Sequence, residues 1–129
     1  MSTRALADAA EFIKSNGTSS FSPFAYYDKD LDCIRVRIKD CSMIEKRMNR
    51  IFTIVIAAHS QQQDDPVGFN IKGVRFLFNQ LKLPKEGVVQ LTAIIDKIVK
   101  VYPDSVAKAV QKKFRQTIKT LEVNLGKAA

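Results

Sequence analysis

Residues 24–39 read FAYYDKDLDCIRVRIK, and this stretch decides the fold class. Across 33–39 aliphatic and basic residues alternate, so the aliphatic side chains face one way and the basic ones the other. Residues 24–27 form the preceding strand, and the aspartate-rich residues 28–32 form a turn between the two. One apolar and one charged face is typical of an antiparallel hairpin. The sequence therefore predicts a sheet that begins with this hairpin.

Further strands follow the hairpin. Residues 43–50 are predicted as a polar strand, 51–58 as an apolar strand and 67–72 as the last strand, with a polar loop over 59–66. The strand over 51–58 is apolar on both faces, so each face needs a cover. A helix of this chain is expected to cover one face, and the N-terminal helix or a second subunit the other.

Helical periodicity occurs at both ends of the chain. It predicts a short helix over 4–14 and three C-terminal helices over 74–83, 88–102 and from Asp104 or Ser105 to about Leu125. The predicted fold is therefore α+β: an antiparallel β-meander of four or five strands, a short N-terminal helix and three C-terminal helices.

The chain is 129 residues long, with 46% hydrophobic and 26% charged residues, which indicates a single globular domain over 1–129. Its parts are the N-terminal helix and loop (1–23), the meander (24–75) and a helical extension (76–129). The apolar window over 51–58 is far shorter than the ~20 residues that cross a bilayer. Asp8 and Glu11 interrupt any signal-peptide core, so a cytoplasmic location is expected.

A tyrosine–aspartate pair, a second aspartate and an alternating strand with an arginine form a recognisable motif. Its residues are Tyr27, Asp28, Asp32, Ile34, Val36, Arg37 and Ile38, followed by Glu45 and the run 67–71. Over residues 24–75 this pattern resembles a family of small bacterial domains of unknown function. The resemblance implies a small β-meander and no assigned activity. Lys29 departs from the pattern, where proline is common, and so do the helices from residue 76 onward.

Positive charge is concentrated in the C-terminal half. Residues 1–65 hold nine basic and nine acidic groups, whereas 66–129 hold twelve and four and therefore carry the whole net charge of +8. An anionic partner is expected to bind this half. On a helical wheel, four basic residues of the last predicted helix fall within about 60° of one another, opposite the apolar side. With two residues of the preceding helix, the candidate partner- or phosphate-binding residues are Lys97, Lys100, Lys108, Lys112, Arg115 and Lys119.

Other constellations indicate structure rather than chemistry. Asp28, Asp30 and Asp32 have the first three spacings of a calcium loop, but Lys39 stands where that loop needs its bidentate glutamate. Stabilisation of the turn by aspartate is the preferred interpretation. His59 and Ser60, with the acids at 64 and 65, lie in a glutamine-rich loop without the rigid elbow that a nucleophile needs. No catalytic residue, cofactor or metal site is therefore predicted.

Two functional hypotheses remain open. The preferred one is a non-catalytic protein-interaction or regulatory module that binds its partner through the helices and forms a homodimer, since one copy has more apolar surface than it can bury. The alternative is a nucleic-acid-binding protein that contacts phosphates through the basic residues of the last predicted helix. The aromatic residues that stack on single strands are absent from that stripe.

Overall fold

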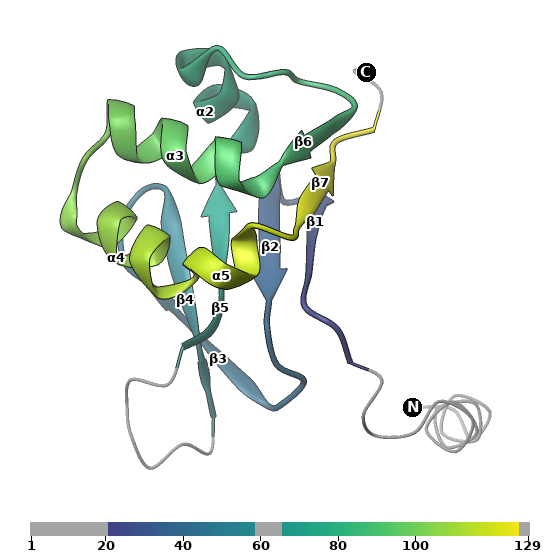
Figure 1. Ribbon diagram of the computed structural model, residues 1–129, viewed down its shortest axis with the longest axis vertical. Helices are drawn as coiled ribbons and strands as arrows, with labels where there is room; N and C mark the ends of the chain where they lie inside the picture. Colours follow the sequence, from purple (N-terminus) through teal and green to yellow (C-terminus); the bar gives the residue numbers. More distant parts are fainter. Residues whose placement is uncertain (1–20, 59–65, 127–129) are drawn as a thin grey trace.

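An antiparallel sheet and a helical layer form the body of the protein. The computed structural model describes residues 21–58 and 66–126. Within these ranges the predicted α+β class is confirmed (Figure 1). The predicted helix over 4–14 and almost all of the predicted loop over 59–66 lie outside the described residues. No helix among the described residues is long and apolar enough to cross a membrane.

Five strands form the main sheet in the order β1-β2-β5-β4-β3, and every neighbouring pair is antiparallel. Their bounds are β1 (Phe24–Asp28), β2 (Cys33–Arg37), β3 (Met43–Arg47), β4 (Phe52–Ala57) and β5 (Pro66–Lys72). The order departs from an uninterrupted meander, because β5 inserts between β2 and β4. The reason is polarity: five consecutive residues of β5, 67–71, are buried, whereas the charged strand β3 tolerates the solvated edge.

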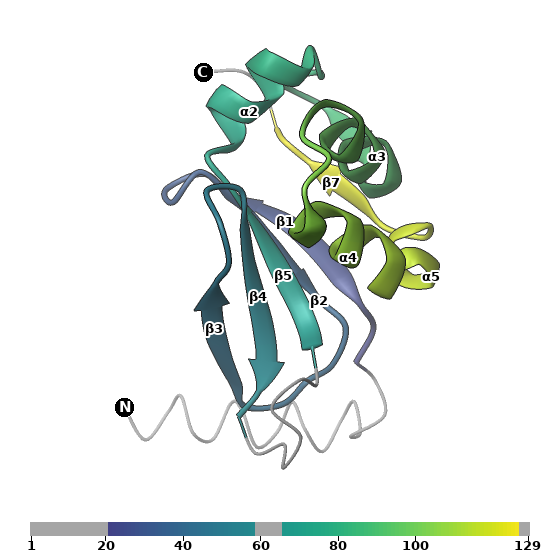
Figure 2. The same ribbon diagram turned by 90° about the vertical axis from the view of Figure 1, so that its left-hand side faces the viewer.

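The helices are α2 (Val74–Leu81), α3 (Leu91–Val101), α4 (Ser105–Lys113) and the short α5 (Arg115–Ile118). Figure 2 shows α3, α4 and α5 on one side of the sheet and α2 across its upper end. Of the two residues that the sequence left open for the start of this helix, Asp104 caps α4, since its Oδ1 accepts the Ala107 amide at 2.7 Å. The buried side of this layer packs on the aliphatic face of the sheet.

The prediction of a continuous final helix to about Leu125 is wrong. Helix α4 ends at Lys113, and the chain finishes in a strand, β7 (Glu122–Asn124), which pairs with β6 (Val88–Gln90). β6 also replaces the first turn of the helix predicted over 88–102. Phe114, at the break, is buried 4.9 Å from the ring of Phe69 in β5. A straight helix cannot both bury Phe114 there and return the chain beside β1, where β7 lies (Figure 1).

A tyrosine, an aspartate and the start of α2 connect the first hairpin to the helical layer. The Tyr27 hydroxyl donates to Asp32 Oδ1 at 2.6 Å, and the same carboxylate accepts the Arg75 amide at 3.2 Å. The local N-cap residue of α2 is Gly73, which has no side chain to cap with. Asp32, at a left-handed φ of 51°, supplies the acceptor from the β1–β2 turn instead. This contact gives the tyrosine–aspartate motif a structural role.

We predict that Tyr27→Phe lowers the free energy of unfolding by about 1 kcal/mol at neutral pH, because it removes the hydrogen bond to Asp32. Burial and this hydrogen bond raise the pKa of Tyr27 above its usual 10.0. Because the pKa of Tyr27 is higher in the folded than in the unfolded protein, the protonated hydroxyl contributes its full stabilisation below pH 10. This contribution is lost as the pH rises through the pKa of Tyr27 in the folded protein. The difference between wild type and Tyr27→Phe should therefore shrink above pH 10, measured by urea unfolding. A difference that stays constant from pH 7 to 11 would contradict this assignment.

Candidate functional site

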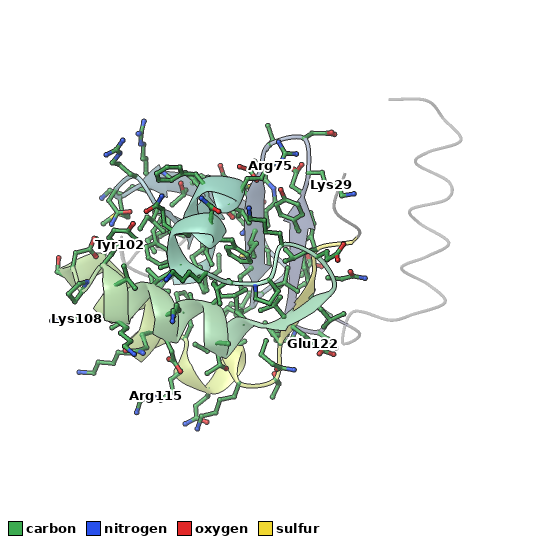
Figure 3. All side chains as sticks on the ribbon, turned by 90° about the horizontal axis from the view of Figure 1, so that it is seen from above. Lys29, Arg75, Tyr102, Lys108, Arg115 and Glu122 are labelled. Carbon is green, nitrogen blue, oxygen red and sulfur yellow. The ribbon has the colours of Figure 1, made fainter. Side chains whose placement is uncertain are left out.

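The structure spreads the predicted basic residues over three helices. Lys97 and Lys100 lie on α3, Lys108 and Lys112 on α4, Arg115 begins α5, and Lys119 follows it. Figure 3 shows Lys108 and Arg115 pointing outward from the helical layer. Because α4 ends at Lys113, the predicted four-residue stripe does not run along one helix.

Arg115 and Lys119 do come together at a small hollow between α3 and α5. Its volume is about 200 Å³, and its wall includes Thr92, Gln111 and Asp96. Gln111 Nε2 donates to Asp96 Oδ1 at 2.9 Å, and this carboxylate lines the same hollow as the two cations. A negative charge in the wall weakens the attraction for a phosphate, which makes the hollow a poorer anion site than the helical wheel predicts.

An apolar groove lies between α4 and strands β3 and β4, and we refer to it as the α4 groove. Its volume is about 340 Å³, within the range of ligand-binding pockets. Its walls are apolar except for Ser105 and Lys113. The other lining residues are Met48, Ile54, Pro66, Val106, Ala109, Val110 and Phe114. The helices cover the centre of the sheet and leave this strip of its aliphatic face open.

Exposed side chains extend the α4 groove over the edge strand. In the β3–β4 register Ile44 pairs with Ile56 and Lys46 with Ile54, so β3 continues the groove floor outward. Ile44 is 52% exposed and Met48 is 45% exposed. Large apolar side chains this accessible beside a groove indicate an interaction surface.

Asn49 fastens one end of the α4 groove. Its Nδ2 donates to Asp104 Oδ2 at 3.1 Å, which ties the β3–β4 turn to the N-cap of α4. Its Oδ1 accepts the backbone amides of Ile51 and Phe52 at 2.9 and 2.7 Å. The two walls of the groove therefore keep a defined separation at this end.

On the opposite face of the sheet, a polar network joins side chains of four strands, β1, β2, β3 and β5. Glu45 Oε1 on β3 accepts from Arg35 Nη1 at 3.0 Å, Asn70 Nδ2 at 3.0 Å and Arg37 Nη2 at 3.4 Å. Arg37 Nη1 also donates to Asn70 Oδ1 at 2.8 Å, and Arg35 Nε pairs with Asp28 Oδ2 at 3.5 Å. Burial lowers the pKa of Arg37, and the negative charge of Glu45 opposes this effect by favouring the charged guanidinium. Glu45, Asn70 and Asp28 together hold the two guanidinium groups in fixed positions.

Gly68 allows this network to form. In the register Glu45, Val55, Gly68 and Arg37 are directly opposite one another, so Glu45 and Arg37 stand about 14 Å apart along the rung. Their side chains meet across Val55, which is fully buried although it faces away from the helices. The second cover that the sequence required for the 51–58 strand thus includes side chains of this chain.

The aspartates of the first turn act on the backbone. Asp28 Oδ1 accepts the amides of Asp30 and Leu31 at 3.1 and 3.2 Å, which confirms the turn-stabilising interpretation for Asp28. Among residues 21–58 and 66–126, no group of three His, Cys, Asp or Glu side chains is placed to hold a metal ion. Cys33 is a buried free thiol in β2, and burial raises its pKa.

Comparison of the chain with protein-family models, with curated proteins and with solved structures finds no match. The resemblance of residues 24–75 to a bacterial domain family stays a prediction. Functional assignment therefore depends on the chemistry of the surfaces.

Sequence reasoning missed both the α4 groove and the polar network. The groove joins residues 48 and 54 to residues 105–114, and nothing local connects these segments. The network had one signal: Arg35 and Arg37 alternate with aliphatic residues, as the sequence analysis noted. Their partners, Glu45 and Asn70, are set by the strand order, which local sequence patterns do not determine.

We predict that Gly68→Ala lowers the free energy of unfolding by about 3 kcal/mol, because a Cβ at residue 68 would lie 2.1 Å from the Val36 carbonyl oxygen. The matched control is Gly73→Ala, where a Cβ meets nothing within 4 Å and only the left-handed φ of 61° is strained. That control should cost about 1–2 kcal/mol in the same urea titration. Equal losses for both variants would show that the close approach at Gly68 does not matter.

Proposed function

We propose that this chain is a non-catalytic protein-interaction module that binds an acidic, amphipathic segment of a partner protein in the α4 groove. The observation that carries the proposal is the open apolar strip between α4 and the β3–β4 hairpin. Val106, Ala109 and Val110 on α4 face Ile54 on β4, which offers a site for a large apolar side chain. Anchors of this kind supply most of the binding energy in protein interfaces.

Charge at the groove rim supports an acidic partner. Lys113 lines the groove, and Lys46 is directly opposite Ile54 on the edge strand. The chain as a whole carries a net charge of +8. Carboxylates that flank an apolar anchor would meet these lysines at the rim, where charge sets selectivity and the rate of association.

The mode of binding follows from the shape of the site. An amphipathic helix places apolar side chains at i, i+3, i+4 and i+7, so one face fits a groove and the other stays in water. In the α4 groove such a helix would lie over Ile44 and Met48, the exposed apolar residues beside the floor. Their burial on binding would contribute apolar stabilisation that a single anchor does not.

The test uses the peptide EELLEEFLEELL, labelled with fluorescein, and its charge-reversed counterpart KKLLKKFLKKLL. We expect the acidic peptide to bind with a micromolar Kd by fluorescence anisotropy and the basic one to bind at least about tenfold more weakly. Ala109→Trp should weaken binding at least about tenfold, because an indole fills the groove. Ala93→Trp is the matched control, since Ala93 is an exposed alanine on α3 away from the groove.

Three results would overturn the proposal. The first is the absence of acidic-peptide binding at about 100 µM, and the second is an equal loss of affinity for Ala109→Trp and Ala93→Trp. The third is a dimer in light scattering that Ala109→Trp converts to a monomer. The groove would then be the contact between two copies, in the homodimer that the sequence led us to expect.

A further inference from the structure

A row of aromatic rings lies along β1, on the sheet face away from the helices. Ring centroids of Phe21 and Phe24 are 5.8 Å apart, and those of Phe24 and Tyr26 are 5.9 Å apart. Phe24 is 40% exposed and Tyr26 is 46% exposed, so both rings are accessible. Exposed aromatics in a row on an open sheet face are platforms on which nucleobases stack.

Basic side chains share this face with the rings. Tyr26 is directly opposite Arg35 and Phe24 is opposite Arg37, so rings and guanidinium groups project from the same side of the sheet. The network through Glu45 and Asn70 holds both arginines in place beside the rings. The side chains of Arg35 and Arg37 are only 20% and 11% exposed, so they contribute fixed positive charge beside the rings, and the stacking surface is that of the rings.

A pair of cations lies farther across the same face. In the register Tyr26, Arg35, Asn70, Thr53 and Arg47 are successive neighbours, which places the exposed Arg47 on this side of the edge strand. Lys72, two residues from Asn70 on β5, also projects from this side, and its partly buried Nζ donates to the Asn49 carbonyl at 2.6 Å. Burial and the nearby charge of Arg47 lower the pKa of Lys72. Two neighbouring cations repel, and a phosphate between them relieves that repulsion.

We infer that this sheet face binds single-stranded nucleic acid. Bases stack on Phe24 and Tyr26, and phosphates contact Arg47 and Lys72. The path from β1 to β3 crosses four inter-strand spacings, about 19 Å, which suits a short extended strand. A duplex keeps its bases stacked internally and offers the rings nothing, so the site selects single strands. This site is separate from the α4 groove, which lies on the other side of the sheet.

The experiment measures anisotropy of fluorescein-labelled oligouridylate and oligothymidylate, each of about 15 nucleotides, and of a duplex of the same length. We expect both single strands to bind, and the duplex to bind at least about tenfold more weakly. Phe24→Leu and Tyr26→Leu keep an apolar side chain and remove the ring, and each should weaken binding about fivefold or more. Arg47→Glu should flatten the salt dependence by about 0.7 in log–log slope. A preference for oligouridylate would identify RNA as the ligand class, and equal affinities would indicate stacking without recognition of the sugar.

The matched control is the double variant Lys112→Glu/Arg115→Glu on the helical layer. If the sheet face is the site, this variant keeps at least half of the wild-type affinity, whereas the ring variants do not. Far-ultraviolet circular dichroism confirms that each variant is folded before it is compared. The inference fails if wild type does not bind either single strand at about 100 µM, or if the ring variants bind as tightly as wild type. It also fails if the helical double variant loses more affinity than Tyr26→Leu, which would place the contact on the helices.

Discussion

The central strand β5 must be covered on both faces, and much of the structure follows from this requirement. Residues 67–71 are buried throughout. On the helical side, the ring of Phe69 contacts the rings of both Phe52 and Phe114. On the other side, the cover over Gly68 and Asn70 includes the network in which Glu45 reaches two arginines. A charged network covers an apolar strand here because each guanidinium has carboxylate or amide partners, which offsets the cost of desolvation.

The two faces of the sheet thus have different chemistry. The helical layer packs on aliphatic side chains but stops short of β3, and the uncovered strip is the α4 groove. The opposite face combines fixed arginines with accessible rings on β1 and cations near β3. An apolar groove suits side chains of a protein, whereas rings and cations suit bases and phosphates. The two proposed sites therefore lie on separate sides of one sheet.

Much of the fold was predictable because strand and helix signals are local. Alternation located the hairpin over 24–39, and the apolar stripe located the helix that spans 91–101. The strand over 122–124 also had a signal, since Leu121, Val123 and Leu125 alternate with polar residues. The apolar spacing of a helix, from Phe114 to Ile118, was extended into that segment, where the chain is a strand with a period of two. Five of the six candidate basic residues are exposed and Lys97 is half-buried, but their predicted alignment assumed one continuous helix, whereas α4 ends at Lys113.

The amino-acid sequence by itself determined the α+β class, the positions of the main-sheet strands, a helix start at residue 104 or 105 and the concentration of positive charge in the second half. These depend on neighbours a few residues apart, where periodicity and capping act. Tertiary structure alone decided that β5 lies between β2 and β4, that β6 pairs with β7, and that residues 48 and 54 meet α4. Such contacts join segments tens of residues apart, and burial of the whole core selects among the alternatives that local preferences leave equal.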